Sequence, residues 1–221
     1  NHCSRYYNQS GEICPLPGRL HLENKMREMT KNAVRVLALA VSECPIDESG
    51  KFSRLILIGL VGIRDEIRPE ARAAVHQVCN AGIQVVLITG DNKETAAAIA
   101  KESGLITGRN QGEVITSSEL ASMSDNEVKN RMPSLRVVAR ALPADKSRLV
   151  NLAQEIGLVA GMTGDGINDA PALKKSDVGF SMGSGTEVAK EAGDIVILDD
   201  NIASIAKAIL YGRTIFKSIR K

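Results

Sequence analysis

Aromatic residues are scarce in this sequence: phenylalanine, tyrosine and tryptophan make up 3% of its 221 residues, and tryptophan is absent. The formal net charge is only +2. Proteins that bind nucleic acids use a concentrated positive field, and those that bind single strands also stack bases on aromatic rings. The composition therefore argues against nucleic acid as a partner.

Long apolar runs are missing as well. The longest, residues 55–63, is about half as long as a helix that crosses a bilayer, so we expect a buried strand there. Polar residues follow Asn1, so no secretory signal peptide is predicted. The chain begins without methionine and stops at Lys221 within a helical pattern. We therefore expect it to be a section of a longer protein.

The cysteines form no C-x-x-C pair and show no spacing typical of a metal finger. There are four of them: Cys3, Cys14, Cys44 and Cys79. A disulfide framework is expected in a short secreted chain and not in one of this length and composition. We interpret the cysteines as reduced thiols in a cytosolic compartment.

Strand and helix patterns alternate along the chain with short connections. Apolar runs predict strands at residues 34–41, 55–63, 83–88, 136–139, 158–162, 178–181 and 194–198. Helix-favouring segments lie at residues 20–32, 69–80, 93–102, 144–156 and 169–175. We expect irregular or edge structure at residues 1–18 and a looser region at 104–133. The alternation predicts an α/β fold with a doubly wound parallel sheet.

The last segment carries apolar residues at helical spacing from Ile202 to Ile219, with basic residues distributed along it. Two interpretations stay open. It is either a surface helix that closes the domain or a stalk that runs toward a membrane, where basic residues would lie on the cytoplasmic side.

Three polar clusters follow predicted strands, where an open parallel sheet binds its ligands. The first is Thr89, Gly90 and Asp91, between a strand and a helix. A hydroxyl and free backbone N–H groups at a helix start can hold phosphate oxygens. The same three residues also suit an ordinary turn with a helix cap.

The second cluster is Arg140 and Lys146, on either side of Pro143. Lys146 falls in the first turn of a predicted helix, where a cation is unfavourable with the helix dipole. We therefore expect an anionic neighbour, either a carboxylate or a phosphate. The alternative is a solvated charge on a surface helix.

The third cluster is Asp165, Asn168 and Asp169, in a glycine-rich turn. Two carboxylates and an amide grouped in this way suit Mg²⁺, which keeps several waters and bridges to phosphate. A turn that caps the next helix would need fewer polar residues than this one contains.

Longer sequence strings around these clusters point to a single protein family. Residues 163–179 (TGDGINDAPALKKSDVG) resemble the hinge signature of P-type cation-transporting ATPases, which belong to the haloacid dehalogenase superfamily. The strings VRVLALA (34–40), GIRDEIR (62–68), VLITGDNKETAAAIA (86–100) and ARALPADK (139–146) follow the family's order. The resemblance covers the chain from end to end and is closest to the calcium-pumping branch.

In that family an aspartate takes the γ-phosphate of ATP, and this intermediate drives ion transport. By resemblance, Asp165 ligates Mg²⁺ with support from Asp169, and Asn168 lies near the phosphate. Lys146 neutralises the transferred group, and Thr89 contacts it.

The resemblance also implies nucleotide contacts and a hinge. Arg35 reaches ATP from the nucleotide-binding domain, while Arg140 and residues 89–91 contact the nucleotide. Asp65 and Arg68 form the hinge between the two domains.

The sequence departs from the family in one respect that matters for catalysis. The phosphorylated aspartate of the family begins an Asp-Lys-Thr-Gly-Thr string, and no aspartate here does so. We expect residues 1–64 to be the C-terminal part of the nucleotide-binding domain. Residues 65–206 would be a phosphorylation domain without its first strand, and 207–221 the start of a stalk helix. Alone, the chain would be inactive.

The missing first strand would leave the strands at 83–88 and 158–162 without a partner between them. We expect those two strands to pair directly, to borrow a strand from another copy, or to exist only within a larger structure, which we favour.

The resemblance implies that the parent protein is an ATP-driven pump in a membrane, for which we expect the cell membrane, and that this chain lies at the cytoplasmic face. Its cation, for which the resemblance points to calcium, would bind between membrane helices that this chain lacks. Two other interpretations stay open: a non-enzymatic α/β module that binds phosphate or Mg²⁺, and a soluble haloacid dehalogenase phosphatase.

Overall fold

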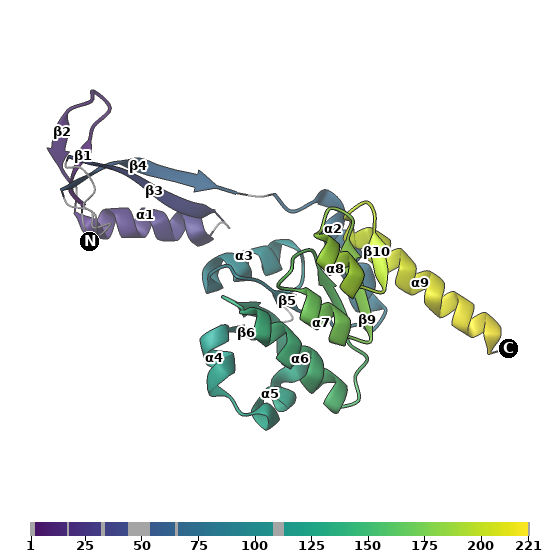
Figure 1. Cartoon of the computed structure of the whole chain (residues 1–221). Coiled ribbons are helices and arrows are strands. Elements are labelled where there is room, and N and C mark those ends of the chain that lie inside the picture. Colours follow the sequence, from purple (N-terminus) through teal and green to yellow (C-terminus); the bar gives the residue numbers. More distant parts are fainter. Residues whose placement is uncertain are drawn as a thin grey trace. The chain divides into compact units, whose positions relative to one another are not determined.

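The computed structural model describes residues 3–16, 18–31, 34–43, 54–64, 66–107 and 113–220. The chain divides into two compact units, Asn1–Glu66 and Ile67–Lys221 (Figure 1). In the described part of the chain, no helix combines the length and the apolar content that a membrane crossing needs.

The first unit is a four-stranded sheet with one helix. The strand order is β2 (Ile13–Pro15), β1 (Cys3–Tyr7), β4 (Leu55–Ile63) and β3 (Arg35–Ser42), and the helix is α1 (Arg19–Lys31). β1 pairs with β2 and β3 with β4 antiparallel, while β1 and β4 run parallel. The sheet of this unit is therefore mixed. The parallel strands that the sequence predicts lie in the second unit, where they form two sheets and not one.

One expectation for the first unit is confirmed in part and another needs correction. Of the irregular or edge structure expected at residues 1–18, residues 3–15 form a hairpin of β1 and β2, with β2 at the edge of the sheet. The Asn8 side chain fixes the turn of this hairpin by accepting from the N–H groups of Ser10 and Glu12. β4 was expected to be buried, yet Ile56 is its one fully buried residue. Ile58 and Val61, for example, are 50% and 43% exposed.

The second unit contains two three-stranded parallel sheets. The first has the order β5 (Leu87–Ile88), β7 (Leu135–Ala139) and β6 (Glu113–Thr116). The second has the order β8 (Gly161–Gly164), β9 (Val178–Met182) and β10 (Ile195–Ile197). The predicted α/β fold with parallel strands is confirmed.

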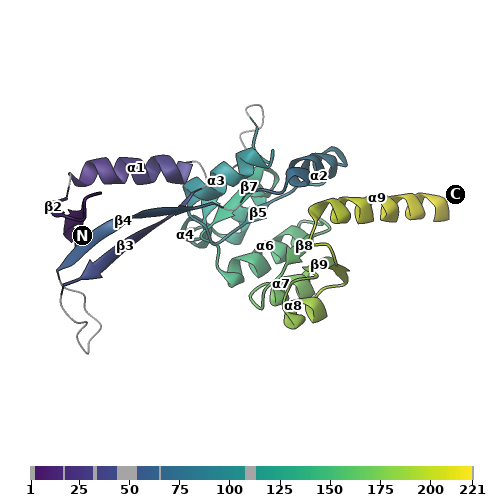
Figure 2. The same ribbon diagram turned by 90° about the horizontal axis from the view of Figure 1, so that it is seen from above.

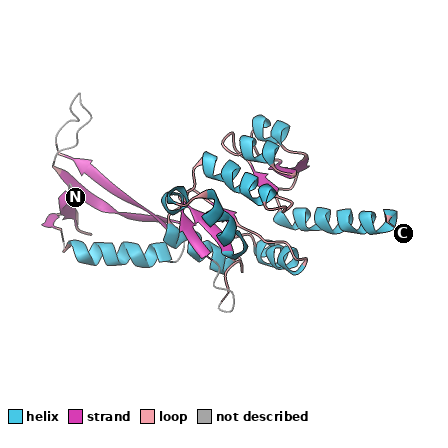
Figure 3. Ribbon diagram, turned by 90° about the horizontal axis from the view of Figure 1, so that it is seen from below, coloured by secondary structure: helices cyan, strands magenta, loops and turns pink. Residues whose placement is uncertain are grey.

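Helices connect and cover these strands (Figures 2 and 3). In chain order they are α2 (Pro69–Asn80), α3 (Lys93–Glu102), α4 (Ser117–Ser122), α5 (Asp125–Arg131), the 3-10 turn η1 (Met132–Ser134), α6 (Pro143–Glu155), α7 (Ala170–Lys175), α8 (Glu187–Ala192) and α9 (Ile202–Ile219). Helices α2 and α3 agree with the sequence prediction at both ends. Pro69 occupies the first turn of α2, and the Asn92 side chain caps α3 by accepting from the N–H of Thr95.

The region around 104–133 is more ordered than predicted, because it holds β6, α4, α5 and η1. Both short helices begin with a capping box, formed by Thr116 with Glu119 and by Ser124 with Glu127. These S/T-x-x-E patterns are readable in the sequence and would have located the helix starts. Helix α8 was missed as well.

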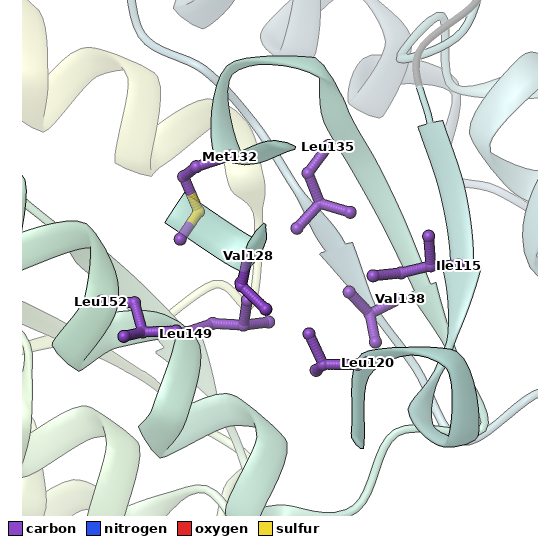
Figure 4. Packing of buried hydrophobic residues seen from close by; sticks show 8 residues of the cluster. All are labelled: Ile115, Leu120, Val128, Met132, Leu135, Val138, Leu149 and Leu152. Carbon is purple, nitrogen blue, oxygen red and sulfur yellow. The ribbon is translucent and has the colours of Figure 1, made fainter. Parts of the chain in front are cut away.

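Apolar clusters lie on both faces of the β5–β7–β6 sheet. One cluster joins Leu135 and Val138 of β7 to residues from β6, α4, α5, η1 and α6 (Figure 4). The other joins Val137 and Ala139 of β7 to α2 and α3. From Val137 to Ala139, successive β7 side chains thus reach opposite layers, so this part of the strand is buried on both faces.

The β5 and β8 strands do not pair with each other in the described structure, so direct pairing is excluded among the three alternatives for these strands. Within the strand predicted at 83–88, only Leu87–Ile88 adopts strand structure. The Gln84 side chain explains part of this, because its amide donates to the carbonyls of Met132 and Leu135 at 2.7 and 2.8 Å. The Gln84 side chain therefore occupies carbonyls at and just before the start of β7. A longer β5 would extend its backbone pairing with β7 in this direction.

Candidate functional site

The loop after β5 and the end of β7 are bound together by their backbones. The N–H of Arg140 donates to the Asp91 carbonyl at 2.8 Å, and the N–H of Ala141 donates to the Thr89 carbonyl at 2.9 Å. Arg140 has φ +51°, in the left-handed region that few side chains adopt. The structure thus brings the first predicted cluster together with Arg140 at the carboxyl ends of neighbouring parallel strands.

Inside this loop, Thr89 and Asp91 bind each other. The Thr89 hydroxyl donates to the Asp91 carboxylate at 3.0 Å and accepts from the Asp91 N–H at 3.1 Å. Gly90 between them is exposed. The cap of the following helix is Asn92, so Thr89 and Asp91 are not needed as its N-cap. They shape a short loop whose exposed tip is Gly90.

Lys146 binds Asp169, which lies 23 residues away in the chain. The ammonium is 2.5 Å from the carboxylate, and the side chains of Lys146 and Asp169 are 20% and 8% exposed. The prediction that Lys146 has an anionic neighbour is therefore confirmed, and the neighbour is a carboxylate. This pair connects the start of α6 to the start of α7.

The second oxygen of Asp169 fixes the loop that carries Asp165. It accepts from the N–H groups of Asp165 and Gly166, each at 3.2 Å. Burial alone would raise the pKa of Asp169. The hydrogen bonds from Lys146 and from these N–H groups outweigh burial, so the pKa lies below its usual value. Asp169 is therefore ionised at neutral pH and fully engaged within the protein.

Glycine at position 164 permits this arrangement. A Cβ atom there would lie 2.4 Å from the Cβ of Asp169, which no side chain could tolerate. The backbone of β8 therefore approaches the Asp169 side chain as closely as it does only because residue 164 has no Cβ.

Asp165 and Asn168 are exposed on this loop. Asp165 makes no side-chain hydrogen bond or ion pair among the described residues. Its carboxylate is thus the more available of the two predicted metal ligands. The described residues contain no group of three histidine, cysteine or acidic side chains that could hold a metal. The exposed Asp165 carboxylate is an oxygen ligand of the kind that Mg²⁺ uses, since Mg²⁺ is bound by one or two carboxylates together with waters and phosphate oxygens.

The remaining predicted residues lie elsewhere. Arg35 is exposed on β3 of the first unit, where it pairs with Ile63 of β4. Asp65 lies outside the described residues. Arg68 is the residue before α2, and its guanidinium donates to the carbonyl of Asp199 at 3.3 Å.

Comparison with known families identifies the domain. Residues 17–177 match a family model described as haloacid dehalogenase-like hydrolase, and residues 152–209 match a second model with the same description. The chain belongs to the haloacid dehalogenase-like hydrolase family.

Curated relatives of this haloacid dehalogenase-like chain are named as cation pumps. It is 41% identical to the calcium-transporting ATPase PAT1 of Dictyostelium discoideum over 99% of its own length and 20% of the relative's. It is 39% identical to a calcium-transporting ATPase of Bacillus subtilis over 98% of its length and 25% of the relative's. The chain thus spans about a fifth to a quarter of the length of these two relatives.

A solved structure agrees with this relationship. A zinc-transporting PIB-type ATPase in an E2.Pi state matches 92% of the haloacid dehalogenase-like chain and 26% of its own, with a TM-score of 0.63 and 26% identity. The predicted relationship to P-type cation-transporting ATPases is confirmed.

Sequence reasoning missed one part of the site. The N–H of Thr186 donates to the Asp165 carbonyl at 2.8 Å. Residues 183–186 therefore contact the loop that carries Asp165. The string GSGT at these positions, followed by an acidic residue, is a turn and helix-start pattern that would have placed a loop here.

Proposed function

We propose that the chain is a section of an ATP-driven cation pump, which couples ATP hydrolysis through an aspartyl phosphate to transport, with calcium as the cation. Residues 1–64 would be the C-terminal part of the nucleotide-binding domain, residues 65–206 the phosphorylation domain without its first strand, and residues 207–221 the start of a stalk helix. The observation that carries this proposal is the Lys146–Asp169 pair, which holds the Asp165 loop at the carboxyl end of β8. The calcium-transporting names of the relatives support the choice of cation.

Phosphoryl transfer needs positioned charge more than covalent work by the protein. In the proposed site Asp165 would hold Mg²⁺, and the bound ion would supply positive charge at the transferred group. Lys146 adds a second positive charge, oriented by Asp169. Asn168 lies on the same loop and offers an uncharged donor to phosphate oxygens.

The Thr89–Asp91 loop would contribute a further contact to the phosphate. Its exposed Gly90 allows a phosphate group to approach the backbone closely. Arg140, tied to this loop through its own N–H, would contact the nucleotide. Arg35 of the first unit would bind the same ATP, and Arg68 would form the hinge with Asp65.

The aspartate that accepts the phosphate would come from outside this sequence, since no Asp-Lys-Thr-Gly-Thr string is present. We infer that the chain by itself neither accepts phosphate from ATP nor turns ATP over. In the parent protein it would lie at the cytoplasmic face of the cell membrane, with the cation bound in membrane helices.

The test uses the longer protein encoded by the parent gene, reconstituted in vesicles. Acid-stable incorporation of labelled phosphate from ATP is expected, with uptake of calcium and not zinc. Lys146→Met should lower the rate of phosphate incorporation by roughly a factor of 100 or more, because it removes a charge at the reacting group. Lys174→Met, which changes an exposed lysine on α7, is the matched control and should be near wild type. Equal activity in both variants would contradict the proposal.

A further inference from the structure

The loop that carries Asp165 is bound to the loop that follows β9. The N–H of Thr186 donates to the Asp165 carbonyl at 2.8 Å. A Cβ atom on Gly185 would lie 2.8 Å from the same carbonyl oxygen, so glycine is required there. The Asp165 backbone is therefore bound to residues 183–186 and packed directly against them.

Asp200 holds the other side of residues 183–186. Its carboxylate accepts from the N–H of Ser184 at 3.0 Å, while the N–H of Gly183 donates to the Ile197 carbonyl at 2.8 Å. Asp200 adopts φ +51°, a left-handed conformation that an L-residue keeps only when its surroundings impose it. Hydrogen bonds from Ser184, together with the charge of Arg68, lower the pKa of Asp200. Its carboxylate is thus ionised at neutral pH.

The backbone next to Asp200 is bound by Arg68 and by the first turn of α9. The Arg68 guanidinium donates to the Asp199 carbonyl at 3.3 Å. The Asp199 carboxylate accepts from the Ser204 hydroxyl at 2.7 Å. Three elements therefore meet at residues 199–200: the loop after β9, the residue that precedes α2, and the start of α9.

Helices α2 and α9 are also joined further along. The Arg213 guanidinium, in the middle of α9, donates to the carbonyl of Ala81, which ends α2, at 2.6 Å. A guanidinium-to-carbonyl bond thus fastens each end of α2 to the α9 segment. Since both helices start near residue 200, a shift at this point moves the two helices together.

We propose that Asp200 is a positioning residue that keeps the Asp165 loop in register with the start of α9 and with Arg68. A change at the Asp165 loop is thereby passed to α9 through residues 183–186. The identity of the ligand at Asp165 rests on the proposed function. The contacts that assign the role to Asp200 do not depend on it.

The test is hydrogen–deuterium exchange on the 221-residue chain with the variants Asp200→Asn and Asp194→Asn. Asparagine tolerates the left-handed conformation, so Asp200→Asn removes the charge without straining the backbone. Asp194→Asn is the matched control: Asp194 accepts from the N–H of Gly179 at 2.8 Å, a bond of the same kind at the opposite end of β9.

Without metal, Asp200→Asn should speed exchange roughly tenfold in three segments together, 164–169, 183–187 and 199–206. Asp194→Asn should speed exchange near residues 178–181 and leave those three segments unchanged. A response to Asp200→Asn confined to residues 183–184 and 199–201, or spread evenly over the second unit, would overturn the proposal.

The second measurement is the effect of Mg²⁺ on hydrogen exchange in α9. Replacing a residue with a purely structural role would leave this effect unchanged. In the wild type and in Asp194→Asn, Mg²⁺ should slow exchange in the first turn of α9, and in Asp200→Asn this response should disappear. A response that persists in Asp200→Asn would also overturn the role of Asp200. If calorimetry detects no Mg²⁺ binding by the wild type, the proposed metal site fails, and the metal-free comparison still decides the role of Asp200.

Discussion

The ammonium of Lys146 lies 2.5 Å from the carboxylate of Asp169, and both side chains are largely buried. One oxygen of Asp169 thus accepts from the Lys146 ammonium, while the other accepts from two backbone N–H groups of the Asp165 loop. A single carboxylate therefore sets the position of both the cation and the exposed acid that we propose as a metal ligand.

The first prediction concerns the stability that this pair provides. Asp169→Asn should lower the free energy of unfolding by about 2–4 kcal/mol, because it leaves the buried Lys146 charge without a counter-charge. Urea denaturation of the 221-residue chain measures this change. Glu187→Gln breaks an ion pair with Lys190 in which the glutamate is 82% exposed, and it should cost less than about 1 kcal/mol. Equal losses of unfolding free energy in the two variants would show that the Lys146–Asp169 pair stabilises the fold no more than an exposed ion pair does.

The second prediction is the pH dependence of that stability. Folding lowers the pKa of Asp169, so folding favours the ionised form. The resulting contribution is complete above the pKa of an unfolded aspartate, about 3.9, and is lost as the pH falls through the lower folded pKa. The difference in unfolding free energy between wild type and Asp169→Asn should therefore be largest at neutral pH and shrink below about pH 4. A difference that grows on acidification would contradict the assigned direction of the pKa shift.

The third prediction concerns metal binding. The wild-type chain should bind Mg²⁺ weakly in calorimetry, because Asp165 is the available carboxylate and the family's phosphorylated aspartate is missing. Asp165→Asn should weaken binding by roughly tenfold or more. Asp177→Asn is the control, since its carboxylate is used to accept from the N–H of Ala160 at 2.7 Å. Tight binding that Asp165→Asn leaves unchanged would remove Asp165 from the site.

The fourth prediction concerns Arg148, which fastens the turn between α4 and α5 to α6. Its guanidinium donates to the carbonyls of Leu120 and Met123, each at 2.8 Å, and to the Asp125 carboxylate. Arg148→Met should cost about 1–3 kcal/mol, because both carbonyls lose the guanidinium donor and the Leu120 carbonyl keeps only the 3.3 Å bond from the N–H of Met123. Asp125→Asn removes only the ion pair with a 62% exposed carboxylate and should cost less than about 1 kcal/mol. Urea denaturation distinguishes the two, and the larger loss in Asp125→Asn would refute the assignment.

The fifth prediction belongs to the proposed pump. Arg35→Ala in the parent protein should weaken ATP binding and leave phosphorylation by inorganic phosphate nearly unchanged, because Arg35 lies in the first unit. Labelled-nucleotide binding and phosphorylation by inorganic phosphate measure the two effects. Equal losses in both assays would indicate that Arg35 only supports β3.

Local signals in the sequence located most of the helices and strands. Pro69 marks the start of α2 and Asn92 the cap of α3, and both helices have their predicted bounds. These features act within one turn of the chain, so neighbouring residues suffice to predict them. The strings around Asp165 and Thr89 likewise identified the family.

The tertiary structure decided which side chains meet. Lys146 and Asp169 are 23 residues apart, and Arg68 and Asp199 are 131 apart. The sequence predicted an anion near Lys146 but could not choose among several acids, because that choice depends on how helices and sheets pack. The shortening of β5 has a similar origin, in the bonds that Gln84 makes to residues 48 and 51 positions away. Residue types and local spacing thus determined the elements and the family, while through-space packing decided the partners of each charge.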